Sequence, residues 1–113
     1  MAARGTCILF VSCPNAKVAG AIARHLVDAK LAACGNITAP VTSIYRWKGK
    51  VRRESEVLLF VKTRRSLVKA CSKAIQALHP YEVPEIVGVP IVDGLPGYLR
   101  WVARETQAGS SRR

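Results

Sequence analysis

The hydrophobic pattern of the first third of the chain predicts a buried strand followed by an amphipathic helix. Residues 7–13 form a short apolar run of strand-forming residues, which Pro14 and Asn15 interrupt. Asn15 is a preferred residue type at a helix N-cap. After it, apolar residues recur at the spacing of one helical face: Val18, Ile22, Leu26 and Ala29. The glycine and asparagine within 34–36 predict the end of this helix.

Residues 41–63 predict a long β-hairpin. Two strand-like runs meet at Lys48 and Gly49, where a tight turn is expected. Alternation along the strands places Val41, Tyr45 and Trp47 on one face of the first run, and Val57, Leu59 and Val61 on one face of the second. The tip is basic, because only Glu54 and Glu56 accompany its cations: Arg46, Lys48, Lys50, Arg52 and Arg53.

The remaining chain predicts a helix, a strand and a terminal helix. Ser66 is expected to cap the helix, whose apolar face holds Leu67, Cys71, Ala74, Ile75 and Leu78. Pro80 ends this helix, because a proline disfavours helical backbone in the residue before it. Residues 85–92 predict a strand in which Pro90 implies an edge or a strand end. The segment 95–106 carries the apolar residues of a short last helix.

The predicted order of elements is strand, helix, strand, strand, helix, strand and a last helix. This order defines an α+β fold of the ferredoxin-like type, a βαββαβ sandwich with a long β-hairpin and a C-terminal helix. We expect one domain over residues 7–106, an N-terminal segment at 1–6 and a disordered tail at 107–113. Because helices cover one face of such a sheet, the other face needs a partner, which strand pairing with further copies would supply.

Charge and cysteine content narrow the class of protein. The chain has 113 residues, with 18 Lys and Arg against 7 Asp and Glu, and a net charge of +11. This excess of positive charge raises nucleic acid, anionic lipid and acidic small molecules as candidate partners. The four cysteines form no CxxC pair, which argues against a zinc ribbon and a disulfide-stapled secreted domain. The first apolar run is too short for a signal peptide or a membrane span, so we expect a soluble, cytoplasmic protein without membrane contact.

Four segments carry a family resemblance: KLAACGNI at 30–37, TSIYRWKGKV at 42–51, ESEVLLFVKT at 54–63 and HPYEVPEIV at 79–87. In this order and spacing they closely resemble the CutA divalent-cation-tolerance family. The resemblance implies a ferredoxin-like subunit in a homotrimer and a role in tolerance of divalent metal ions, with copper binding in some members. In animal relatives it implies a link to acetylcholinesterase anchoring, and hence a protein partner. The architecture is also similar to trimeric PII-type signal proteins, which bind nucleotides and small effectors between subunits, although a shared fold does not fix function.

The histidine of HPYEVPEIV is the candidate metal ligand. A neutral imidazole suits copper, and Pro80 would present His79 at the end of a helix. For copper-binding members of the family, the resemblance implies two adjacent histidines at this joint and a cysteine in the first strand. This chain has Leu78 and Val11 at the two companion positions. Copper is therefore expected as an optional ion, and no cofactor is expected to be obligatory.

The same segment allows two other interpretations. Its prolines make it a rigid elbow between helix and strand, in which Tyr81 packs and its hydroxyl finds a partner. Alternatively, it borders a ligand cleft that faces the hairpin and holds a nucleotide or another anionic metabolite. The residues of this cleft would be Trp47, Lys48, Lys50, Arg52, Tyr81, Glu82 and Glu85. Solvated cations on an exposed hairpin would explain the basic tip without any ligand.

Aromatic residues are the candidates for a trimer interface: Tyr45, Trp47 and Trp101. The cysteines are interpreted as small core residues. The chain has no recognisable Ser-His-acid arrangement, glycine-rich phosphate loop or HExxH motif, which predicts that it is not an enzyme. Three functions remain: a binding or scaffolding protein in metal-ion tolerance, a sensor of an anionic metabolite, and a platform for protein assembly or trafficking. Nucleic acid is not expected as a partner.

Overall fold

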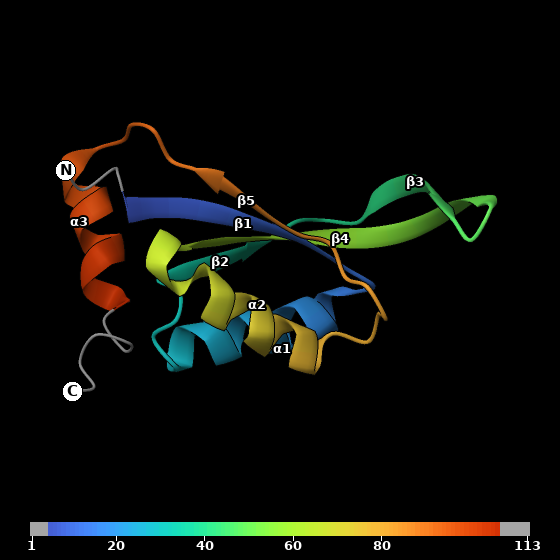
Figure 1. Cartoon of the computed structure of the whole chain (residues 1–113), viewed down its shortest axis with the longest axis horizontal. Helices are drawn as coiled ribbons and strands as arrows, with labels where there is room; N and C mark the ends of the chain where they lie inside the picture. Colours follow the sequence, from blue (N-terminus) through green and yellow to red (C-terminus); the bar gives the residue numbers. More distant parts are fainter. Residues whose placement is uncertain (1–4, 107–113) are drawn as a thin grey trace.

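The computed structural model describes residues 5–106 and shows an α+β fold with one antiparallel sheet and three α-helices (Figure 1). The strands are β1 (Thr6–Cys13), β2 (Cys34–Ile37), β3 (Val41–Trp47), β4 (Lys50–Arg64) and β5 (Ile86–Pro90). The helices are α1 (Ala16–Asp28), α2 (Val68–Leu78) and α3 (Pro96–Glu105), and a 3₁₀ turn at Arg65–Leu67 precedes α2. The tail predicted at 107–113 lies outside the described residues.

The sheet follows the order β2, β4, β1, β5, and each neighbouring pair is antiparallel. Along β1, for example, Phe10 lies opposite Phe60 of β4 on one side and Val87 of β5 on the other. β3 pairs with β4 beyond the end of β2, so β4 belongs to both the sheet and the hairpin. This is the predicted ferredoxin-like order, with the long hairpin and the C-terminal helix added to it.

Helices α1 and α2 cover one face of the sheet and lie below it in Figure 1. β1 sends alternate side chains toward them, including Leu9 and Val11, which are fully buried. The set predicted on β4 is buried as well, which confirms its shared face: Val57, Leu59 and Val61. The helices contribute Ile22, Leu26, Cys71 and Ile75 to the same core. Burying a side chain of this size contributes about 1.5–3 kcal/mol relative to exposure, which holds the helices on the sheet.

The two long helices begin differently. Asn15 caps α1 as predicted, because its Oδ1 accepts a hydrogen bond of 2.9 Å from the backbone nitrogen of Val18. Leu67 occupies the N-cap of α2 and makes no side-chain capping bond, so the prediction that Ser66 caps this helix was wrong. The 3₁₀ turn before α2 leads the chain into that helix instead.

Both inferences from prolines in the second half are confirmed. His79 follows α2 with an extended backbone, φ −87° and ψ 134°, as expected for the residue before Pro80. β5 is an edge strand and ends at Pro90, where the missing N–H costs no bond in the middle of the sheet.

Helix α1 ends at Asp28, so the end predicted at 34–36 was wrong. The backbone nitrogen of Leu31 closes the helix with a hydrogen bond of 2.9 Å to the carbonyl oxygen of Leu26. This closure places Lys30 in a left-handed conformation, φ 60°, where glycine is the preferred residue. A lysine at that position gives no signal of a helix end, and the pattern therefore predicts a longer helix.

The glycine expected at the helix end lies instead in β2, a strand that the sequence pattern did not predict. A Cβ on Gly35 would lie 3.0 Å from Ala23 Cβ and 3.2 Å from Leu59 Cδ1. Glycine here allows α1 and β4 to pack closely against β2. Residues 38–40 then lead into β3 opposite only residues 57–58 of β4, and this bulge separates the sheet from the hairpin.

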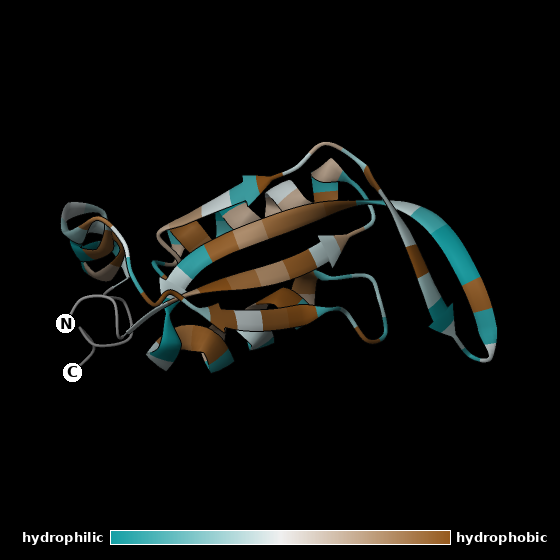
Figure 2. Cartoon of the chain, turned by 90° about the horizontal axis from the view of Figure 1, so that it is seen from above, coloured by the Kyte–Doolittle hydropathy of each residue, from teal (hydrophilic) through white to brown (hydrophobic). Residues whose placement is uncertain are grey.

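The face of the sheet opposite the helices is apolar and open to solvent. Phe10, Val87 and Val89 lie on it and are 36%, 48% and 41% exposed. Phe10 contacts Phe60 of β4, with ring centroids 5.2 Å apart. Figure 2, seen from above, shows hydrophobic residues along the central strands and many hydrophilic residues along the hairpin. An open apolar surface of this kind is typical of a surface that associates.

Candidate functional site

Strands β3 and β4 extend past the sheet as a twisted hairpin, at the right in Figure 1. Its turn is formed by Lys48 and Gly49, as predicted, and both are left-handed, with φ 51° and 80°. The turn fixes the register, so Tyr45 lies opposite Arg52 and Ser43 lies opposite Glu54. Because paired residues share a face of the hairpin, the turn decides which side chains gather there.

A cleft of about 600 Å³ lies between the hairpin and the loop that joins α2 to β5, and we call it the hairpin cleft. Three aromatic side chains line it: Tyr45, Trp47 and Tyr81. Four carboxylates line it as well: Glu54, Glu56, Glu82 and Glu85. Among the described residues of its lining, Arg52 is the only cation. The cleft is therefore acidic, although the whole chain carries a net charge of +11.

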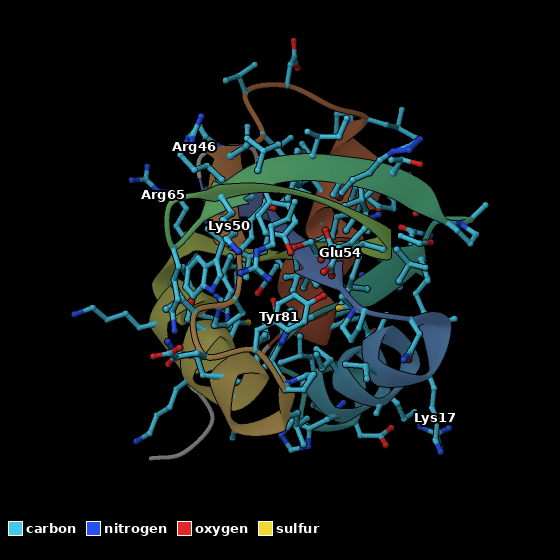
Figure 3. All side chains as sticks on the ribbon, turned by 90° about the vertical axis from the view of Figure 1, so that its right-hand side faces the viewer. Lys17, Arg46, Lys50, Glu54, Arg65 and Tyr81 are labelled. Atoms are coloured by element: carbon cyan, nitrogen blue, oxygen red, sulfur yellow. The ribbon has the colours of Figure 1, made fainter. Side chains whose placement is uncertain are left out.

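A hydrogen bond joins the two walls of the cleft. The Tyr81 hydroxyl donates it to Oε2 of Glu56 over 2.8 Å. Glu56 belongs to β4 and is only 6% exposed, so the bond ties the loop after α2 to the hairpin. Burial and the neighbouring carboxylate raise the pKa of Tyr81, which keeps its hydroxyl protonated as a donor. In Figure 3, Tyr81 and Glu54 lie near the middle of the view.

Arg52 has a buried hydrogen-bond donor without a partner beside the cleft, within the described residues. Its Nε atom is buried and has no hydrogen-bond partner among residues 5–106. It lies opposite Tyr45, whose pKa is raised by desolvation and by the carboxylates of Glu54 and Glu56. A buried donor without a partner costs about 1–3 kcal/mol, so a group from outside the described chain would be favoured here.

Both ring nitrogens of His79 already have partners. Nε2 is 2.7 Å from the carbonyl oxygen of Ser12, and Nδ1 is 3.2 Å from the backbone nitrogen of Tyr81. Because a backbone N–H donates, Nδ1 accepts, and Nε2 carries the proton that it donates to Ser12. The imidazole also contacts the Tyr81 ring, with centroids 4.7 Å apart. His79 thus fastens the elbow after α2 to β1.

Metal binding by His79 stays a prediction. An ion would take a lone pair from a ring nitrogen and would break one of these two hydrogen bonds. Within residues 5–106, no three side chains of His, Cys, Asp or Glu are grouped so that they could hold a metal ion.

Most of the predicted cleft residues come together. The lining includes Trp47, Arg52, Tyr81, Glu82 and Glu85, but not Lys48 or Lys50. Lys48 instead places its Nζ 5.8 Å from the centre of the Trp47 ring, at the turn. The sequence interpretation missed six other lining residues, and it named Tyr45 for the trimer interface rather than among the cleft residues. The six are Ser12, Ser43, Ile44, Glu54, Glu56 and Val83. The register counted from the Lys48-Gly49 turn is the signal that would have found most of them.

The aromatic residues predicted for a trimer interface fall in two places. Tyr45 and Trp47 line the hairpin cleft, and Tyr45 is 37% exposed. Trp101 lies on α3, at the other end of the molecule, where its ring contacts Tyr98 with centroids 5.5 Å apart. Their part in an interface stays a prediction.

Three of the four cysteines are core residues, as expected: Cys7, Cys13 and Cys71. Burial raises the pKa of Cys13 and of Cys71 to about 11, which suppresses the reactive thiolate. Cys34 is only half-buried, and its Sγ lies 3.6 Å from the hydroxyl of Tyr98.

The fold and the cleft together define an α+β protein of ferredoxin-like topology, with an aromatic and acidic cleft on a projecting hairpin. Residues 7–105 match the family described as CutA1 divalent ion tolerance protein. The chain belongs to this family, which confirms the resemblance seen in its sequence.

Known proteins support the assignment over most of the chain. The solved structure of the divalent cation tolerance protein (Cut A1) from Thermus thermophilus is 44% identical and gives a TM-score of 0.88, covering 89% of this chain and 98% of that chain. Protein CutA from Mus musculus is 49% identical over 102 residues, or 90% of this chain and 58% of the mouse protein. The chain thus spans little more than half the length of this mammalian relative.

The compartment of the protein stays a prediction. None of the helices described in residues 5–106 is long and apolar enough to cross a membrane. One relative, from Arabidopsis thaliana, is 40% identical over 88% of this chain and 55% of its own length, and its name describes it as chloroplastic. Membership of the family therefore does not imply a cytoplasmic location.

Proposed function

We propose that the protein is a homotrimeric binding protein, linked to divalent metal ion tolerance, that has no enzymatic reaction of its own. The observation that carries this proposal is the hairpin cleft, a cavity of about 600 Å³ with aromatic and carboxylate walls. Clefts of this size that combine aromatic side chains with positioned polar groups are typical ligand sites. We propose that its ligand is a cation.

Charge is the reason for preferring a cation to an anion. An anionic metabolite would meet the carboxylates of Glu54, Glu56, Glu82 and Glu85, with Arg52 as the only cation among the described lining residues. The lysines expected to hold a nucleotide, Lys48 and Lys50, are outside that lining. The sensor of an anionic metabolite is therefore the weaker candidate.

A panel of ligands followed by thermal unfolding tests this choice. A ligand at one hundred times its dissociation constant adds about 2.7 kcal/mol to the free energy of unfolding. The cations of the panel are divalent metal salts and amines. We expect at least one of these two classes to raise the Tm and nucleotides to leave it unchanged. A panel in which only nucleotides raise the Tm would overturn the proposal and favour the sensor.

The open apolar face of the sheet supports the homotrimer. Phe10, Val87 and Val89 would lose their solvent exposure if strands of further copies covered that face. Sedimentation equilibrium at micromolar concentration should give three times the chain mass of 12.3 kDa. Phe10→Glu should shift the protein toward single chains, whereas Val92→Glu, at a residue 86% exposed, should not. A parent protein that sediments as single chains would refute the trimer.

Copper is the ion to which the family resemblance points, with His79 as its candidate ligand. The two hydrogen bonds of His79 favour a structural role for this residue instead. Anaerobic titration with Cu(I) and Cu(II) compares the parent with His79→Gln and with a control at an exposed histidine, His25→Gln. We expect the same copper stoichiometry in all three proteins. A loss of copper in His79→Gln alone would establish His79 as a ligand.

A further inference from the structure

Aromatic rings and carboxylates share the walls of the hairpin cleft. Tyr45, Trp47 and Tyr81 offer ring faces, which attract ammonium and guanidinium groups through the ring quadrupole. The chain already shows this contact at the edge of the cleft, where Lys48 Nζ lies 5.8 Å from the Trp47 ring centre. A wall of this composition suits an organic cation, whose carbon chain packs on the rings while its charge meets a carboxylate.

Glu56 is the carboxylate with the strongest need for such a partner. It is 6% exposed, and within residues 5–106 its carboxylate accepts one hydrogen bond, from the neutral hydroxyl of Tyr81. No Lys, Arg or His among residues 5–106 forms an ion pair with it. A buried carboxylate without a counter-charge is costly, and a cation entering the cleft would relieve that cost.

The spacing of the carboxylates favours an extended cation over a compact ion. Glu54 and Glu56 are two residues apart on β4, so their Cβ atoms project from one face about 7 Å apart. Divalent metal ions need several ligands converging to about 2.0–2.6 Å, and the described carboxylates are not grouped in that way. Two ammonium groups joined by a short carbon chain would reach both carboxylates at once.

Arg52 limits the amine site on the side nearer the turn. It precedes Glu54 on the same face of β4, and its positive charge would repel an ammonium group there. The second ammonium group of the ligand is therefore favoured in the rest of the cleft, between Glu54, Glu56 and Tyr81.

We propose that the hairpin cleft binds an aliphatic diamine or polyamine, with ammonium groups on Glu54 and Glu56 and the carbon chain against Tyr45 and Tyr81. This inference rests on the proposed function, because it names the class of cation for the same cleft. It makes the protein a receptor for organic amines in addition to its link with divalent ions.

Isothermal titration of the full chain with spermidine and putrescine tests the proposal. We expect saturable binding that weakens as salt is raised, since the contacts are ionic. Glu56→Gln should weaken it about tenfold to a hundredfold, the loss expected for one hydrogen bond to a charged group. Glu105→Gln removes the same charge on α3, away from the cleft, and should leave the affinity unchanged.

A second variant keeps the test valid if Glu56→Gln does not fold. Glu54 is exposed, and Glu54→Gln should also weaken amine binding while the circular dichroism spectrum stays that of the parent. Undetectable binding of both amines, or equal affinity in Glu54→Gln and the parent, would overturn the proposal.

Parallel titrations with Zn(II) and Mn(II) distinguish the amine inference from the proposed cation site. If these ions bind in a manner sensitive to Glu56→Gln and the amines do not bind, the amine inference fails and the cation site stands. If neither class binds, both fail. If the glutamine variants instead change the sedimentation of the protein, the cleft holds a basic side chain of a second copy, which also overturns the amine inference.

Discussion

The hydroxyl of Tyr81 donates a 2.8 Å hydrogen bond to the buried carboxylate of Glu56, and this bond connects the loop after α2 with β4. The two residues lie on opposite walls of the hairpin cleft, so the bond limits how far the walls separate. His79 helps to hold Tyr81 in place, since its Nδ1 accepts a hydrogen bond from the backbone nitrogen of Tyr81. The elbow is therefore both a rigid joint and one wall of the site.

Tyr81→Phe should lower the free energy of unfolding by about 1–3 kcal/mol, because it leaves the buried Glu56 carboxylate without its donor. Urea unfolding of the parent and the variant measures the change. Tyr98→Phe is the matched control, since the hydroxyl of Tyr98 makes only a long contact, 3.6 Å, with Cys34 Sγ. Equal decreases in the free energy of unfolding of the two variants would mean that the bond to Glu56 contributes no more to stability than the contact of Tyr98.

Lys30→Gly should stabilise the protein by about 0.5–1 kcal/mol, because glycine adopts the left-handed backbone that closes α1 without steric cost. Lys73→Gly makes the same substitution at an exposed position in the middle of α2 and should destabilise the protein by about as much. Thermal unfolding should therefore move the Tm in opposite directions. A lower Tm for Lys30→Gly would show that the lysine side chain matters more than its backbone conformation.

Gly35→Ala should destabilise the protein by about 1–3 kcal/mol, since the new methyl group would meet Ala23 Cβ at 3.0 Å and Leu59 Cδ1 at 3.2 Å. Gly20→Ala places a methyl group on α1 with nothing within 4 Å, and a small gain is expected. Urea midpoints for the two variants test the contrast. A neutral Gly35→Ala would show that α1 and β2 move apart easily.

Stability should fall as the pH rises from 9 toward 11. Burial raises the pKa of Cys13 and of Cys71 from 9.0 to about 11, so the folded protein holds these protons more tightly than the unfolded chain. Their contribution is complete below pH 9.0 and is lost as the pH approaches about 11. Urea unfolding across this range should show a shallower decline in stability for Cys13→Ala than for the parent protein. Identical slopes for the two proteins would contradict a contribution from the Cys13 thiol.

The sequence pattern predicts the order of helices and strands well, because period-two and helical spacing directly reflect burial on the sheet and on α1 and α2. It fails between α1 and β3 for backbone reasons. Lys30 closes a helix in a conformation usually given to glycine, and Gly35 serves close packing within a strand. Neither fact is visible in hydrophobic spacing.

The lining of the cleft was predicted in part. Counting cations along the hairpin suggests an anion site, whereas alternation along β4 brings Glu54 and Glu56 into the lining and leaves Arg53 out of it. Lys48 and Lys50 flank the turn and are also outside that lining. The sign of the charge at a local site depends on the face that each residue occupies, and the net charge of the chain does not predict it.

The fluorescence of Trp47 during a spermidine titration tests the central claim, an amine site in the hairpin cleft, most directly. The chain has 2 tryptophans, so Trp101→Phe leaves Trp47 in the cleft wall as the only reporter. We predict a saturable change in its emission that Glu56→Gln weakens and Glu105→Gln does not. An emission that spermidine leaves unchanged, or a change equally strong after Glu56→Gln, would contradict the account.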